Sequence, residues 1–432
     1  LFISSTGGLS AGRVNAELAL FPYYTVDKIT ENSENTGSKT ILLVRQGDHT
    51  SLWEPFSARY QGIYRIERHL YKNIAGDALI FEEMNHTLGL SFRYAWRTSD
   101  QYGFVKTGWL HNLSGESREV QLLDGIQNLL PYGATAALQG GFSNLLDAYK
   151  RAELDSATGL GIFTLSATLT DLAEPSESLK ATTVWQVGLP APRYLLSNAQ
   201  LDRFRRGEAI EQENDVRGQR GAYFVYAALE LAAGTQQEWH IVADVNQDSA
   251  DVVATREALK MPGELSSRLE YDIRHTSEGL AAIIACADGL QLTGDQLSAA
   301  HHWSNVLFNS MRGGIFADGY RIDTSDLRDF IAARNRNLLH ASADFFAGLP
   351  ATLDIHDLVA RAANTGDPNI ERLCYAYLPL TFSRRHGDPS RPWNTFSINL
   401  KNPNGTRQLD YQGNWRDIFQ NWESLAYSYP EF

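Results

Sequence analysis

Cysteine is nearly absent, because the 432 residues include only Cys286 and Cys374. Two cysteines exclude a disulfide framework and a zinc site built from cysteine ligands. Each of them lies in an apolar stretch, and free cysteines are commonly buried, so both are predicted to be core residues. The scarcity of cysteine also suits a reducing compartment.

Positive charge is also in short supply. The chain has 38 Lys and Arg against 51 Asp and Glu, and its net charge of −13 is spread along the whole sequence. This balance argues against a protein that wraps nucleic acid or that lies on an anionic membrane through a basic surface. The ligand is therefore expected to be neutral or a small anion.

Long apolar runs are missing as well. The longest, residues 279–287, is far shorter than the roughly 20 residues that span a bilayer, and the chain does not open on a signal peptide. We therefore expect a cytoplasmic protein that makes no membrane contact. The chain begins with Leu1 instead of Met and stops at Phe432 just after an expected helix, so we interpret it as a fragment of a longer polypeptide.

Several catalytic motifs do not occur in the sequence. It contains no G-x-S-x-G, H-E-x-x-H or G-x-G-x-x-G segment, so serine hydrolases, zinc metalloproteases and dinucleotide enzymes lose their main support. His301 and His302 are adjacent and point to different faces of a helix, which favours capped or partly buried histidines over a metal pair. No metal or cofactor is expected. Four further histidines lie on or beside expected strands and are interpreted as sheet residues: His69, His86, His111 and His240.

Up to about residue 246 the sequence alternates with a period of two, which is typical of β-strands. Many short strands without regular helices between them predict a large antiparallel β-sandwich. A helical insertion at 141–152 and an exposed polar loop at 200–213 interrupt the pattern. The expected strands are 38–45, 62–70, 89–97, 103–111, 117–123, 161–170, 181–187, 222–231 and 238–244.

From about residue 250 the periodicity becomes helical. We expect a β-sandwich domain at 1–246, a helical linker at 247–292 and the beginning of an all-α domain at 293–432. Thr293 can cap one helix, which Gly313 and Gly314 would end. The expected helices are 252–260, 266–286, 293–312, 324–346, 355–364 and 370–376.

The chemically richest loop spans residues 381–396. It combines arginines with His386, Asp388 and Trp393, and its glycine and prolines disfavour regular structure. Arginine forks bind planar oxyanions, so the loop could hold phosphate or an acidic sugar. A surface loop held by Arg–Asp pairs, with the indole packed on proline, explains the same residues. The three arginines are Arg384, Arg385 and Arg391.

A second polar segment forms an expected helix from about Trp415 onward. At 3.6 residues per turn one side is apolar, and the other carries Asp417, Gln420, Asn421 and Ser424. Sugar sites need this mixture, because carboxylates and amides bind hydroxyl groups while an indole lies on the apolar face of the ring. A solvated helix face is the alternative. The expected core side holds Trp415, Ile418, Phe419, Trp422 and Leu425.

Residues 413–421 resemble a motif of the inverting glycoside phosphorylases of the cellobiose and chitobiose phosphorylase type, glycoside hydrolase family 94 and its relatives. That family carries Gly, an aromatic residue, Arg-Asp, two residues and Gln-Asp on an early helix of an (α/α)6 toroid. The resemblance implies that Arg416 and Asp417 bind substrate, with Gln420 beside them. Asn421 stands where the family has Asp. The implied fold is a β-supersandwich, a helical linker and the first helices of the toroid.

The same resemblance implies an activity. The enzyme would act on β-linked gluco- or N-acetylglucosamine-type oligosaccharides, with inorganic phosphate as co-substrate and no cofactor. It would dimerise through the sandwich. The general acid of the family lies well downstream of the Arg-Asp helix, so it would follow Phe432. The full set of expected substrate-binding residues is Trp415, Arg416, Asp417, Gln420, Asn421, Arg384, Arg385, His386 and Trp393.

Two other functions fit the sequence. A non-catalytic carbohydrate-binding or structural protein would present its ligand groove, if it has one, on the sandwich. An inverting (α/α)6 glycoside hydrolase would differ from the phosphorylase only in using water as the nucleophile.

Overall fold

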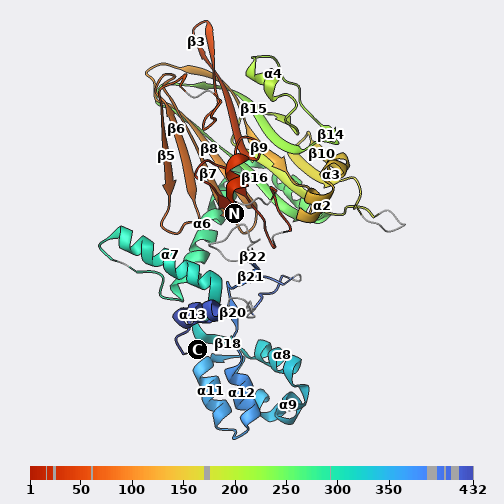
Figure 1. Ribbon diagram of the computed structural model, residues 1–432, viewed down its shortest axis with the longest axis vertical. Helices are drawn as coiled ribbons and strands as arrows, with labels where there is room; N and C mark the ends of the chain where they lie inside the picture. The colour runs from red at the N-terminus through yellow and green to blue at the C-terminus, as the bar shows by residue number, and fades with distance from the viewer. Residues whose placement is uncertain are drawn as a thin grey trace. The chain divides into compact units, whose positions relative to one another are not determined.

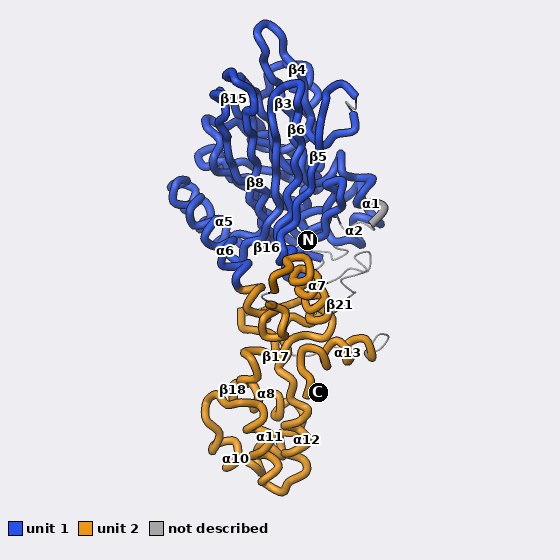
Figure 2. Tube along the Cα trace, turned by 90° about the vertical axis from the view of Figure 1, so that its left-hand side faces the viewer, with its two compact units in different colours: residues 1–278 blue, residues 279–432 orange. Residues whose placement is uncertain are grey.

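A computed structural model describes the chain except for residues 16, 23–25, 60–61, 170–175, 292, 387–396, 403–404, 410–417 and 432. The chain forms two compact units, Leu1–Glu278 and Gly279–Phe432 (Figure 2). Among the described residues, no helix combines the length and the apolar character that a bilayer crossing requires.

The first unit contains a large sheet, which among the described residues has nine strands, each antiparallel to its neighbours (Figure 1). Its edge strands are β14 and β5. In spatial order the strands are β14 (Asp215–Arg217), β10 (Lys150–Asp155), β11 (Leu160–Leu165), β12 (Ala181–Val187), β16 (Gln236–Gln247), β8 (Gly103–Asn112), β7 (Leu90–Ser99), β6 (Leu79–Asn85) and β5 (Ile66–Lys72).

A small sheet of five described strands, also antiparallel, packs on the large one. One core joins them, with Leu42 and Val225 from the small sheet and Phe92 and Trp239 from the large sheet. Gly125 lets β9 and β15 approach closely, because a Cβ there would lie 2.2 Å from the carbonyl oxygen of Tyr223. The strands are β13 (Arg193–Leu195), β15 (Gly221–Leu231), β9 (Arg118–Leu129), β3 (Gly37–Gln46) and β4 (His49–Trp53).

Two segments of this unit differ from the sequence prediction. The helix expected at 141–152 is two short helices, α2 (Ala136–Gly141) and α3 (Ser143–Tyr149), and the chain then enters β10. The loop expected to be exposed at 200–213 contains α4 (Leu201–Arg205), whose Leu201 and Phe204 are buried against the outer face of the small sheet. Near the start of the chain lie β1 (Phe2–Ile3), β2 (Leu9–Ser10) and α1 (Val26–Glu31).

The segment expected to be a separate linker forms α5 (Ser249–Ala258) and α6 (Pro262–Ala285). Asp248 and Asp251 make a capping box at the start of α5. Leu265 and Leu269 of α6 pack on the large sheet against Trp185 and neighbouring apolar side chains. The boundary between the two compact units falls inside α6, so most of this segment packs with the first unit.

The second unit is mainly helical, and its core is formed largely by the residues between β17 and β20. Its short strands pair as β17–β20, β18–β19 and β21–β22. The elements are α7 (Gln296–Gly313), β17 (Ile315–Phe316), η1 (Ala317–Tyr320), β18 (Arg321–Asp323), α8 (Thr324–Arg334), α9 (Arg336–Ala341), α10 (Ala343–Ala347), β19 (Thr352–Asp354), α11 (Ile355–Ala363), α12 (Pro368–Tyr375), β20 (Leu380–Thr381), β21 (Arg384–His386), β22 (Ser397–Ile398) and α13 (Ile418–Ser428).

Two helix boundaries correct the sequence prediction. Asp295, not Thr293, caps α7, because its Oδ1 accepts the N–H of Leu297 at 3.1 Å while the Thr293 hydroxyl donates to the Asp295 carbonyl. The single helix expected at 324–346 breaks twice. Asn335 has an extended φ of −154° and caps the start of α9, and Ser342 separates α9 from α10.

The two cysteines differ in their burial. Cys374 is buried on α12, as predicted, and burial raises the pKa of its thiol to about 11. Cys286 is exposed, contrary to the prediction, because it follows the last turn of α6; its thiol lies 3.3 Å from the Ala282 carbonyl oxygen.

Candidate functional site

The structure describes part of the predicted sugar-binding set. Arg384, Arg385 and His386 form β21, whose backbone pairs with β22. The other members of the arginine-rich loop, Trp393 among them, lie outside the described residues, as do Trp415, Arg416 and Asp417. The roles of all these residues therefore remain predictions.

Helix α13 begins directly after the Arg416–Asp417 pair. Leu425 is buried as predicted, but four other side chains show the reverse of the predicted burial. Asn421 and Ser424, expected to face a ligand, are buried. Phe419 and Trp422, expected to be core residues, are 78% and 42% exposed. Gln420 is exposed, as a ligand-binding side chain would have to be.

The reversal follows from the partner of α13, which is the carboxyl end of α7. A Cβ on Gly313 would lie 2.4 Å from the backbone nitrogen of Leu425, so the two backbones nearly touch. Only the small-residue side of α13 fits against such a surface. Ser428 strengthens the contact, since its hydroxyl donates to the carbonyl of Gly314 at 2.7 Å.

The aromatic side of α13 is consequently open. The rings of Phe419 and Trp422 meet edge to face, with centroids 5.8 Å apart and planes at 88°. Aromatic rings exposed beside polar groups are suited to bind the apolar face of a sugar. They lie on the helix that directly follows the Arg-Asp pair.

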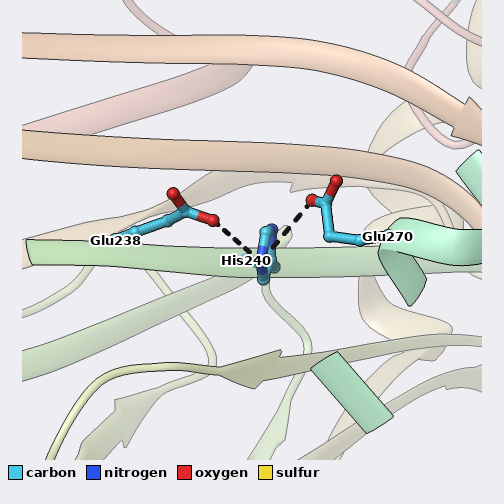
Figure 3. Close-up of side chains that lie close together, drawn as sticks. All are labelled: Glu238, His240 and Glu270. Carbon is cyan, nitrogen blue, oxygen red and sulfur yellow. Dashed lines mark ion pairs between the residues drawn. The ribbon is translucent and has the colours of Figure 1, made fainter. Parts of the chain in front are cut away.

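A cluster of titratable side chains lies in the first unit (Figure 3). Glu238 and His240 share one face of β16 because they are two residues apart, and Glu270 comes from α6. His240 Nε2 lies 3.5 Å from Glu238 Oε1 and 3.8 Å from Glu270 Oε1. Among the residues that the structure describes, these three side chains lie close enough to one another to hold a single metal ion.

Arg97 makes this cluster unfavourable for a cation. Its Nη1 donates to Glu270 Oε2 at 2.9 Å and its Nη2 to Glu270 Oε1 at 2.5 Å. The carboxylate oxygen nearest His240 is therefore already held by a positive charge. Trp109 Nε1 also donates to Glu238 Oε2 at 2.6 Å. The donor set fits an ion-pair network that ties α6 to the large sheet better than it fits a metal centre.

The same network orders His240. Thr107 Oγ1 accepts a hydrogen bond from Arg97 Nη2 at 2.6 Å, so its own proton is free to bond His240 Nδ1 at 3.0 Å. The proton of the neutral ring then lies on Nε2, facing the two carboxylates. Burial lowers the pKa of His240. Burial alone would raise the pKa of Glu270, but the hydrogen bond and charge of Arg97 hold it below its ordinary value.

Sequence reasoning missed a buried ion pair between the sheets. Lys106 Nζ of β8 donates to Asp124 Oδ1 of β9 at 2.5 Å, and both side chains are almost completely buried. Trp239 Nε1 and Thr40 Oγ1 donate to the same carboxylate at 2.7 and 2.6 Å. Burial lowers the pKa of Lys106 despite the neighbouring Asp124. In the sequence, the pair is indicated only by a charged residue at an inward position of each strand. Because both charges are buried and paired with each other, we interpret the pair as structural.

Comparison with known proteins yields one family match. Residues 316–379 match the family model for glycoside hydrolase family 149 insertion domain 1. No curated protein matches the sequence. The matched segment is thus similar to a domain of carbohydrate-active enzymes, which supports a glycoside hydrolase or phosphorylase-like assignment and does not single out family 94.

A search of solved structures finds distant matches. A bacterial glucoamylase complexed with acarbose has 10% identity and a TM-score of 0.42, and the match covers 79% of this chain and 48% of that chain. A putative kojibiose phosphorylase from the human microbiome has 9% identity and a TM-score of 0.36, with 97% and 47% covered. This chain therefore spans about half the length of these two proteins. TM-scores below 0.5 establish no shared function.

The matched segment has the geometry of an inserted domain. Its two ends meet in the β17–β20 pair, where Phe316 is opposite Leu380, so the chain leaves and returns at the same place. Helices α8–α12 lie between these ends. Among the described helices that follow residue 293, α7 and α13 then remain as candidates for walls of the expected toroid. The prediction that residues 293–432 are simply consecutive toroid helices did not include such an insertion.

Proposed function

We propose that this chain is the sugar-binding part of an inverting glycoside phosphorylase that acts on β-linked gluco- or N-acetylglucosamine-type oligosaccharides. The observation that carries the proposal is the exposed Phe419–Trp422 pair on the helix that follows Arg416 and Asp417. The family 149 insertion domain supports it independently. The two packed sheets would be the supersandwich, and α7 and α13 would be helices of an (α/α)6 toroid.

In the proposed reaction a carboxylic acid protonates the glycosidic oxygen while a phosphate oxygen attacks the anomeric carbon from the opposite face. The bond to the leaving sugar breaks, and a sugar 1-phosphate of inverted configuration forms. Arg416 and Asp417 would bind sugar hydroxyl groups, and the aromatic pair would hold a ring. The general acid would be supplied by residues of a longer polypeptide.

The test uses the protein encoded by the complete reading frame that contains this chain. It is incubated with cellobiose or N,N′-diacetylchitobiose, with and without inorganic phosphate, and sugar 1-phosphate is measured. Release that depends on phosphate supports the phosphorylase. Release of free sugars alone identifies the hydrolase, and no turnover of either disaccharide by a folded product overturns the proposal.

Variants then test the residue roles. Arg416→Ala and Asp417→Asn are expected to lower kcat/KM by at least about 100-fold, because buried charged contacts to substrate contribute roughly 3 kcal/mol. Glu423→Gln is the matched control, since Glu423 is exposed on the same helix and is assigned no contact. Unchanged kinetics in the first two variants would remove the substrate-binding assignment.

A non-catalytic carbohydrate-binding protein is the second candidate, because the small sheet carries an open groove of about 310 Å³ on its outer face. Arg45, Gln121, Tyr226 and Glu230 line it. If sugar binding without turnover is lost in Tyr226→Ala and retained in Asp417→Asn, this groove is the site.

A further inference from the structure

A pocket of about 250 Å³, open to solvent, lies between the residues that follow α6 and helices α7 and α13 within the second unit. One wall is a single face of α7, because His302, Asn305 and Asn309 follow helical spacing. Val306 and Ser310 continue the same wall. Tyr427 of α13 lines the pocket from another helix, and its side chain is 66% exposed.

The lining is mostly polar, and Asp288 is the one carboxylate among the described residues that form it. Asn305 and Asn309 each offer an N–H donor and a carbonyl acceptor, which is the pair that vicinal hydroxyl groups require. Among the described residues that line the pocket there is no Lys or Arg, and the carboxylate of Asp288 is exposed at its rim. This set disfavours phosphate and other anions, which need positive charge or convergent backbone N–H groups.

Two further features point to a hydroxyl-bearing ligand. The Ser310 hydroxyl is buried and, among the described residues, has no hydrogen-bond partner. A buried hydroxyl without a partner costs free energy that a ligand or an ordered water can recover. His302 is fixed as a wall residue, since its Nε2 donates to the Asp288 carbonyl at 2.7 Å, and its Nδ1 remains an acceptor.

We propose that this pocket is a second carbohydrate site, which binds one neutral sugar unit between the amide face of α7 and the ring of Tyr427. From α13 the pocket is lined by its last residues, Tyr427 and Ser428, and not by the described residues at its amino end. The proposal does not depend on the phosphorylase reaction, since it requires binding and no turnover.

Isothermal titration with cellobiose and with N,N′-diacetylchitobiose tests it. The titrated proteins carry Asp417→Asn, so that the proposed reaction site does not contribute. Asn309→Ala in this background is expected to weaken binding about tenfold, the equivalent of one to two hydrogen bonds. His301→Ala is the matched control, because His301 is exposed on α7 and does not line the pocket. Equal thermal unfolding midpoints verify that the variants fold.

Replacing Tyr427 separates stacking from packing. Tyr427→Phe keeps the ring and should retain binding, whereas Tyr427→Ala should abolish it. Titration with inorganic phosphate should give no signal. The proposal is overturned if Asp417→Asn alone removes all sugar binding, if Asn309→Ala binds as tightly as its parent, or if phosphate competes with sugar. Failure here leaves the turnover assay, and hence the proposed function, unaffected.

Discussion

Asp124 lies at the centre of a buried hydrogen-bond cluster in the first unit. Its carboxylate accepts hydrogen bonds from Lys106, Trp239 and Thr40, so it joins β8, β16 and β3 to its own strand. Without Asp124, these three donors would stay buried and would lose this acceptor. The cost of removing a buried ion comes mainly from the partner that remains.

Asp124→Ala is therefore expected to lower the free energy of unfolding by about 3–5 kcal/mol. The matched control is Glu119→Ala on the same strand, because the Arg45–Glu119 pair is exposed and such pairs contribute at most about 1 kcal/mol. Urea unfolding followed by far-ultraviolet circular dichroism measures both. A loss below 1 kcal/mol for Asp124→Ala would contradict a structural role for the pair.

His240 gives the fold a pH dependence. Its pKa is lowered in the folded protein, so the unfolded chain binds a proton first as the pH falls below about 6.5. Stability attributable to His240 is then present above that pH and declines below it. Glu238 and Glu270 face the ring, and Arg97 pairs with Glu270 and holds the pKa of that carboxyl group below its ordinary value.

The His240→Asn variant should accordingly lose less thermal stability than the parent between pH 7.5 and 5.5. The measurement is the unfolding midpoint at both pH values, with exposed His275→Asn as the control. If the two variants have the same pH dependence, burial of His240 is not the cause.

At the level of elements, helix α13 shows why amphipathic patterns fail when the partner surface is small. Hydrophobicity alone assigned Phe419 and Trp422 to the core, but the glycine end of α7 lies against the backbone of α13 at Asn421, Ser424 and Leu425, and these are the residues that are buried. The hydrophobic gain from burying a ring is unavailable where two backbones must touch. The sequence carried this information in Gly313, which was interpreted only as a helix end.

Gly313→Ala tests that contact. Its Cβ would meet the backbone of α13 at 2.4 Å, so overpacking should cost about 1–3 kcal/mol in spite of the better helix propensity of alanine. Gly279→Ala is the matched control, because it lies inside α6 with nothing within 4 Å of the added methyl group. The control should gain about 0.5–1 kcal/mol in urea unfolding. Equal effects would show that α13 does not pack on Gly313.

Strand prediction succeeded where burial follows alternation and failed where charges are buried. The β12 and β8 segments have the expected bounds to within a residue.

Strand β6 was missed because Glu82 and Glu83 interrupt its apolar pattern, yet both are buried. Glu83 accepts from Trp53 Nε1 and Arg68 Nε, and such distant partners leave no trace in a local pattern. The helix expected from about Trp415 onward is present as α13, but its exposed side differs from the prediction.

At the scale of the whole molecule, the segment between β17 and β20 is similar to an insertion domain, and it begins and ends at one strand pair. Its core residues include Leu327, Ile331, Leu358 and Leu373, which come from α8, α11 and α12. Leu425 of α13 joins this core, but most of its residues lie between the paired ends, which predicts a part that folds without the rest.

Residues 315–381 expressed alone should therefore show helical circular dichroism and a cooperative thermal transition. A version with Leu358→Asp, which places a charge in the core, should lose both. A broad, non-cooperative transition in the unmodified segment would mean that α7 or α13 is needed to complete its core.

The paired ends of this insertion also set an order of events during synthesis. About 100 residues separate the end of α7 from the start of α13, so at ~5–20 residues per second the ribosome delivers the partner of Gly313 several seconds after α7 itself. The inserted domain emerges within that delay and can fold first. Once this segment has folded, β20 is paired with β17. The chain that follows β20 then starts close to the end of α7, against which α13 packs.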